Sequence, residues 1–323
     1  MRIEKFFVFV FCSYYSFSQP TEWMNKLYME ERKINNIIPK KITETKSVVF
    51  YSLSTKEKRE DIKNLHKNLL NLNVDPVNYL RLDDYLINKS IKKAYVEYFN
   101  QREIKHIIFY EKQIDENEKF LIASFNNKTT LIKTNDNIWY NEGKGIFGDV
   151  EKTMLKNNFE EGNFLPTPQP EFLEKINADF GKIMFTKNPS LEKENLGVVL
   201  FEKIKTKKTP DSEVIKFNNK IDEKNKKLKK LFSTYQFKQE AIEEKEDSRY
   251  YFSKGIKYLF KIIFGRKKSL EKVLNIKIES ETENDFVYLV LLQHSFSKNI
   301  FLNKKQKTYN TWEEAVREFI LNK

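Results

Sequence analysis

The chain has 323 residues, a formal net charge of +12 and an aromatic content of 14%. Its length allows two ordinary domains of roughly 150 residues each. Cys12 is the only cysteine, which excludes an internal disulfide and a metal centre built from several cysteines.

The positive charge by itself would suggest a nucleic-acid partner. However, only eight of the 58 basic residues are arginine, the residue that makes bidentate contacts to phosphate and guanine. The abundance of Lys, Asn, Ile, Phe and Tyr is the bias expected from an AT-rich genome. We therefore expect no nucleic-acid partner. The lysine clusters at 203–208, 224–230 and 265–268 are interpreted as solvated faces or as contacts to an acidic surface.

Residues 1–18 have the outline of a secretory signal peptide. Arg2 and Lys5 flank the start of a short apolar run, and Ser16 and Ser18 have the spacing of small residues before a cleavage site. The run is shorter than the roughly 20 residues that span a membrane. We expect an exported protein, periplasmic or extracellular, whose mature chain lacks cysteine and a transmembrane helix. The alternative is that FFVFVF forms a buried strand.

Residues 19–45 are expected to form an N-terminal arm with a helix, and residues 46–158 a first α/β domain. The run KSVVFYSL has no polar alternation, which is typical of a strand covered on both faces. The predicted elements are a strand at 46–53, an amphipathic helix after Ser54, a strand at 79–82, a helix at 88–101, a strand at 104–110, a hairpin of 120–125 and 129–134, and a helix at 149–158.

Three prolines, Pro166, Pro168 and Pro170, predict a stiff extended linker over 159–170, because proline is excluded from the interior of helices and sheets. Residues 171–323 are then a second α/β domain. Its predicted elements are strands at 182–185 and 196–204, a helix at 217–233, a strand at 237–242, a helix at 247–254, a strand at 258–264, a hairpin of 286–292 and 299–302, and a helix from 311.

The two domains are predicted to be tandem repeats. The stretches 98–112 and 251–267 both begin with Tyr-Phe, reach Ile-Lys and continue into an apolar run. The expected correspondences are Ile104 with Ile256, Phe120 with Phe286 and Phe125 with Phe296. The fold class is therefore α/β, with α+β as the alternative, and each domain is a mixed sheet that ends in a β-hairpin and is flanked by helices.

Glycine-rich phosphate loops are absent from the sequence, which contains eight glycines in all. The first turn from strand to helix carries Ser52, Ser54 and Thr55, at the kind of helix N-terminus that attracts anions. These three residues are a candidate anion site. The alternative is that Ser54 only caps its helix.

Asp83 and Asp84 follow the predicted strand at 79–82. Paired carboxylates at the carboxyl end of a strand can serve as acid and base; the alternative is a helix cap beside a solvated neighbour. The three histidines have no metal-ligand spacing, so no metal and no cofactor are expected. His294 beside Ser295 is a further catalytic candidate, although adjacent strand residues point to opposite faces. His66 is expected on the polar face of its helix.

Trp139 and Tyr140 are candidates for an exposed interface, because surface aromatics anchor partners. We expect a non-catalytic binding module of the bacterial cell envelope, whose partner is an envelope protein or an acidic envelope surface. The alternative is an extracytoplasmic hydrolase or transferase that uses carboxylates in a cleft. The sequence leaves open whether the protein is an enzyme.

Overall fold

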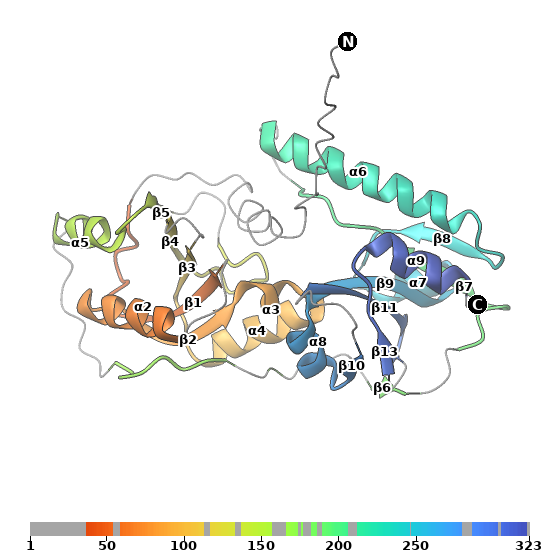
Figure 1. Ribbon diagram of the computed structural model, residues 1–323, viewed down its shortest axis with the longest axis horizontal. Coiled ribbons are helices and arrows are strands. Elements are labelled where there is room, and N and C mark those ends of the chain that lie inside the picture. The colour runs from red at the N-terminus through yellow and green to blue at the C-terminus, as the bar shows by residue number, and fades with distance from the viewer. Residues whose placement is uncertain are drawn as a thin grey trace, which may run out of the picture.

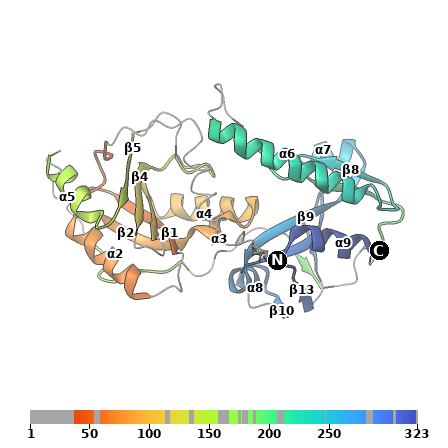
Figure 2. The same cartoon turned by 45° about the horizontal axis from the view of Figure 1, so that its top comes forward.

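The computed structural model describes residues 37–53, 59–112, 117–132, 137–156, 166–173, 176, 182–185, 189–205, 212–245, 247–279, 286–302 and 305–321. Within these residues the chain is a mixed α/β protein with a mixed sheet in each half (Figures 1 and 2). The predicted signal peptide and most of the predicted arm and linker lie outside the described residues.

The first sheet has the strand order β2-β1-β3-β4-β5. The first three of these strands are parallel, and β4 and β5 are antiparallel to their neighbours. The strands are β1 (Lys46–Leu53), β2 (Asp75–Arg81), β3 (His106–Lys112), β4 (Glu118–Ser124) and β5 (Ile138–Gly143).

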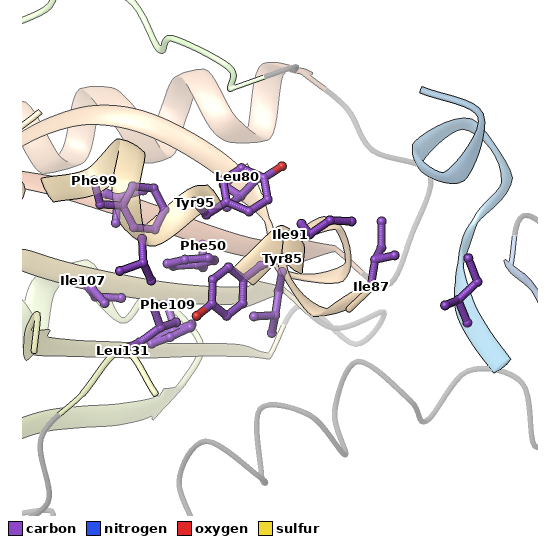
Figure 3. Close-up of a cluster of buried hydrophobic side chains, with 14 of the residues drawn as sticks. Phe50, Leu80, Tyr85, Ile87, Ile91, Tyr95, Phe99, Ile107, Phe109 and Leu131 are labelled. Carbon is purple, nitrogen blue, oxygen red and sulfur yellow. The ribbon is translucent and has the colours of Figure 1, made fainter. Parts of the chain in front are cut away.

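Helices cover both faces of this sheet, as the apolar strands require. The stripes of α2 (Arg59–Asn71) and α5 (Phe147–Lys156) bury one face, and α3 (Leu82–Leu86) and α4 (Lys89–Gln101) bury the other. Helix α4 begins where the Asn88 side chain accepts a hydrogen bond from the Ile91 amide, at 3.0 Å. Figure 3 shows Tyr95 and Phe99 of this helix above Phe50 of β1; the rings of Phe50 and Phe99 lie 5.9 Å apart.

The second sheet has the order β6-β12-β11-β9-β7-β8. Its strands are β6 (Ile183–Met184), β7 (Asn195–Val199), β8 (Gln239–Ile242), β9 (Ile256–Arg266), β11 (Phe286–His294) and β12 (Ile300–Phe301). Helices α6 (Ser212–Phe232) and α9 (Trp312–Leu321) cover one face, and α7 (Ser248–Ser253) packs on the other. Helix α8 (Lys267–Leu274) and the short strands β10 (Lys277–Glu279) and β13 (Lys305–Lys307) were not predicted.

Both sheets share one strand order and one pattern of strand directions. The order β8-β7-β9-β11-β12 repeats β2-β1-β3-β4-β5, with parallel pairs followed by antiparallel pairs. An equivalent hydrogen bond in each half aligns the residues of the two sheets. Phe125 N donates to Lys105 O at 2.7 Å in the first half, and Ser295 N donates to Lys257 O at 2.9 Å in the second.

This alignment of the two halves agrees with one of the expected residue correspondences and differs from the other two. Ile104 and Ile256 hold matching places, each directly before the lysine that accepts the hydrogen bond. Phe125 corresponds to Ser295 and not to Phe296. Phe120 corresponds to Val290 and not to Phe286. Phe120 pairs with Tyr110, five residues after Lys105, and Val290 pairs with Ile262, five residues after Lys257.

The predicted hairpin arm at 129–134 is wrong. The strand that pairs with β4 is β5, and the described part of the earlier segment, up to Ile132, makes the single bridge Phe125–Ile132. A tight turn separates these two residues, in which Asn126 Nδ2 donates to Thr130 Oγ1 at 2.6 Å. Leu131 lies in this turn and adopts φ 64°, a left-handed conformation that is uncommon for a residue other than glycine.

The chain between the two sheets pairs with both of them. Tyr79 N in β2 donates to Glu171 O at 2.8 Å, and Leu173 N donates to Tyr79 O at 3.0 Å. Further along, β6 pairs in parallel with β12 of the second sheet. The segment that follows the three prolines therefore lies against a sheet edge in each half.

One hydrophobic core continues from the first half into the second. It unites the α3–α4 face of the first sheet with side chains of β9, α8 and β11. Ile87 lies at the end of the labelled cluster in Figure 3 and faces this second half. A Cβ atom added at Gly265 would lie 3.4 Å from Ile87 Cγ1, so the Ile87 side chain packs against the backbone of β9 at Gly265.

Candidate functional site

Polar and charged side chains gather where the two halves meet. Strand β2 ends at Arg81, and α3 begins immediately afterwards, which places Asp83 and Asp84 in its first turn. Strand β9 ends at Arg266, directly before α8. The junction therefore brings together the carboxyl end of one strand from each half, the region of an α/β sheet where ligands usually bind.

Asp83 forms two ion pairs at this junction. Its Oδ2 atom lies 3.4 Å from Arg81 Nη2 and 3.2 Å from Arg266 Nε. The exposed fractions of the three side chains are only 8%, 12% and 23%, for Asp83, Arg81 and Arg266 respectively. Because the carboxylate is buried between two guanidinium groups, it ties the halves together and has little freedom to act on a substrate.

Asp84 lies beside Asp83 in a different environment. It lines a cavity of about 130 Å³ with Tyr95, Ile176, Lys268, Ser269, Lys272 and Val273. Burial raises the pKa of Asp84, and the hydroxyl of Ser269, by hydrogen bonding to the carboxylate, offsets part of that rise. Its Oδ1 atom is buried and has no hydrogen-bond partner among the described residues. Burial, with a smaller effect of the Asp84 charge, raises the pKa of Tyr95.

The candidate anion site is described only in part. Ser52 is buried at the end of β1 and is paired in register with Glu111 of β3. Ser54 and Thr55 lie outside the described residues. Glu111 is itself buried, and the next residue, Lys112, pairs with Asp61 in the first turn of α2 at 3.6 Å.

The interface candidates Trp139 and Tyr140 lie on opposite faces of β5. Trp139 is 3% exposed and packs edge-on against Phe120, at a ring distance of 6.1 Å. The expectation of a surface tryptophan is thereby corrected, because α5 covers this face of the sheet. Tyr140 is half-buried and donates to Glu142; burial and this carboxylate raise its pKa.

His294 does not pair with Ser295. The Ser295 hydroxyl donates to Ile256 O at 2.8 Å, whereas His294 Nδ1 lies 3.1 Å from both the amide and the hydroxyl of Ser297. The adjacent serine therefore points away, as the alternation of strand side chains predicts. His294 is the last residue of β11, at the end of the second sheet that is remote from the junction (Figure 1).

His66 is buried, and the expectation that it lies on a polar face is wrong. Its Nδ1 atom lies 2.9 Å from Tyr79 Oη, and its Nε2 atom lies 2.8 Å from Thr167 O. A carbonyl can only accept, so Nε2 carries the proton and Tyr79 donates to Nδ1. The chain that connects the two halves passes over this face of α2 and covers the ring.

Two asparagines of α6 form a feature that sequence analysis missed. The Asn225 amide accepts from Phe201 N at 2.8 Å and donates to Phe201 O at 3.0 Å. Asn218 makes the same pair of bonds to Ile204, at 2.9 and 3.0 Å. The predicted strand at 196–204 therefore ends as β7 at Val199, and the helix satisfies the backbone that follows.

The sequence contains a signal for these asparagines. Asn218 and Asn225 are seven residues apart and fall between the buried Val214, Ile221 and Leu228 on a single helical stripe. A polar residue that recurs on an apolar stripe must find a buried partner. Here the partner is the extended backbone from 201 to 204. Three residues of extended chain span nearly the same length as seven residues of helix, so both asparagines reach it.

The junction can hold two halves together and can place one carboxyl group of raised pKa in a small cavity. Within the described residues, no group of three or more His, Cys, Asp or Glu side chains could hold a metal ion, and no helix is long and apolar enough to cross a membrane. Comparisons of the chain with protein-family models, with curated proteins and with solved structures give no match in any of the three.

Proposed function

We propose that this protein is a non-catalytic binding module of the bacterial cell envelope, exported by the signal peptide at residues 1–18. Its partner is an envelope protein or an acidic envelope surface. In this proposal the two halves act as one unit. The outer surface of that unit contacts the partner.

The observation that best supports this proposal is that Asp83 forms ion pairs at the junction between the two halves. Paired carboxylates were the best sequence-based candidates for catalysis, and one of the two is held by Arg81 and Arg266. The adjacent cavity of about 130 Å³ is smaller than the roughly 300–1,000 Å³ of typical small-molecule sites. Charged groups that join two halves support a scaffold better than they support an active site.

We also propose that the halves are tandem repeats from a duplicated α/β domain. The shared strand order, the shared strand directions and the matching hydrogen bonds at Lys105 and Lys257 support this origin. Chance similarity of sequence would not reproduce a five-strand order together with its directions. The segment of α8 and β10, which lies between β9 and β11, is then an insertion in the second repeat.

The test is capture of the partner in the native host. The protein is tagged at its C-terminus, intact cells are cross-linked and the envelope is fractionated. A stoichiometric envelope component in the captured material supports the proposal. A soluble protein in the periplasm that captures nothing, in a host grown under several conditions, would contradict it.

An extracytoplasmic hydrolase or transferase is the second candidate, and Asp84 is the observation that favours it. A carboxyl group of raised pKa in a cavity can act as a general acid. Asp84→Asn tests this role, because the change removes the acid and preserves the shape. An activity found in a substrate screen and lost in Asp84→Asn, with unfolding unchanged, would favour the enzyme.

A further inference from the structure

Two phenylalanines protrude from the end of the second sheet that is farthest from the first half. Phe252 is 84% exposed and Phe296 is 74% exposed. Phe252 belongs to the last turn of α7, and Phe296 to the turn after β11. Both lie beside the start of β9, whose other end reaches the junction at Arg266 (Figures 1 and 2).

The backbone around both rings is fixed. Ser295 Oγ donates to Ile256 O at 2.8 Å, which joins the turn that holds Phe296 to the first residue of β9. On the other side, the Gly255 amide donates to Phe252 O at 2.9 Å, and Gly255 has φ 63°, a conformation that suits glycine. Hydrogen-bonded backbone therefore holds both exposed rings at the same end of the sheet, where together they can form one contact surface.

Lysines surround this end of the second half, and we call the two phenylalanines with these lysines the distal tip. Lys254 and Lys298 each follow a protruding phenylalanine by two residues, and Lys257 is the second residue of β9. Glu240 and Glu194 pair with Lys254 and Lys257. The last turns of α6 add exposed lysines, because this helix must return to the end of the sheet where β8 begins (Figures 1 and 2): Lys226, Lys227, Lys229 and Lys230.

We infer that the distal tip docks on an anionic lipid bilayer. The two phenylalanine rings enter the interface between headgroups and acyl chains, where an aromatic ring is stabilised. The lysines lie at the level of the anionic headgroups, whose charge attracts them. This inference rests on the proposed envelope role and specifies the acidic surface as lipid. It places the first half away from the bilayer.

Vesicle sedimentation tests the inference. The protein is purified in the form that its host makes, and is mixed with vesicles of phosphatidylcholine alone or with 30% phosphatidylglycerol, in roughly 50 and 500 mM salt. We expect binding to the anionic vesicles at low salt, and at least about tenfold weaker binding for Phe252→Ser/Phe296→Ser. Leu155→Ser is the matched control, since Leu155 is 72% exposed in α5 of the first half and should be neutral.

A local readout separates the distal tip from the rest of the chain. Phe296→Trp should show a blue shift of its emission when anionic vesicles are added. Wild-type binding by the double variant, an equal loss in Leu155→Ser, or no blue shift would each overturn the inference. If vesicles are not bound and an envelope protein is captured through Phe252 and Phe296, the bilayer is wrong and the proposed function stands.

Discussion

Arg266 and Asp83 are 183 residues apart in the sequence, and Arg266 Nε donates to Asp83 Oδ2 at 3.2 Å. This bond joins the end of β9 in the second half to the first turn of α3 in the first half. Arg81, the last residue of β2, holds the same carboxylate oxygen at 3.4 Å. The ion pairs therefore fix the point at which the shared hydrophobic core passes between the two sheets.

Asp83→Asn should lower the free energy of unfolding by roughly 3 kcal/mol, because two largely buried guanidinium groups lose their counter-charge. Urea denaturation measures the change. The matched control is Asp247→Asn, which breaks the exposed pair with Arg249 and should leave the midpoint unchanged. Equal effects of the two substitutions would contradict the role assigned to the junction.

Asn225→Ala and Asn218→Ala should each lower the free energy of unfolding by roughly 1–3 kcal/mol. Each change leaves a backbone N–H and C=O of the segment 201–204 without their side-chain partners. Asn219→Ala, on the exposed face of the same helix, is the control and should have little effect. Hydrogen exchange at the Phe201 and Ile204 amides should speed up only in the first two variants.

Acid should destabilise the protein through its buried histidines. Burial lowers the pKa of His106 to about 4 and also lowers that of His66. Histidine in the unfolded chain becomes protonated near pH 6.5, whereas His106 of the folded protein stays neutral to about pH 4, so the loss of stability begins near pH 6.5 as the pH falls and continues to about pH 4. His66 contributes in the same direction. His106 alone accounts for roughly 3 kcal/mol.

His106→Gln should remove that share of the pH dependence, as measured by urea denaturation at several pH values between 4 and 8. His294→Gln is the comparison, because His294 is half-buried at the end of β11 and should change the profile less. An unchanged profile in His106→Gln would show that other groups cause the acid sensitivity.

Gly197→Ala should destabilise the second half by about 1–3 kcal/mol through overpacking. A Cβ atom there would lie 2.7 Å from Ile242 Cδ1 and 2.9 Å from atoms of Ile256 and Leu259. Gly148→Ala is the control: it adds a methyl group in helix α5 with nothing within 4 Å, and should be neutral or slightly stabilising. Thermal unfolding of both variants distinguishes the two environments.

The sequence predicted most of the helices and strands because their apolar residues recur with the period of each element. It failed where a turn determines the outcome: Leu131, with a left-handed backbone, lies in the turn between Phe125 and Ile132, and periodicity does not reveal this turn. It also failed for His66, whose face of α2 is covered by Thr167, a residue about 100 positions later.

The candidate site was predicted only in part, for a similar reason. Asp83 and Asp84 were recognised from their place after a strand, but nothing local identifies Arg266 or Ser269 as their partners. Because of these long-range contacts, the two candidate catalytic residues differ in role: Asp83 is a structural carboxylate, and Asp84 is a carboxyl group that lines a cavity. In contrast, Asn218 and Asn225 could have been found, since their spacing on the apolar stripe of α6 is visible in the sequence.

The chain between the two sheets also affects how the protein behaves at high concentration. An open strand edge invites pairing with a second molecule, and such pairing leads to aggregation. Residues 171–173 occupy the outer edge of β2, and the two-residue strand β6 occupies that of β12. The connecting segment thus covers one edge of each sheet. In the second sheet the new edge strand is β6, and two residues are too few to pair stably with a strand of another molecule.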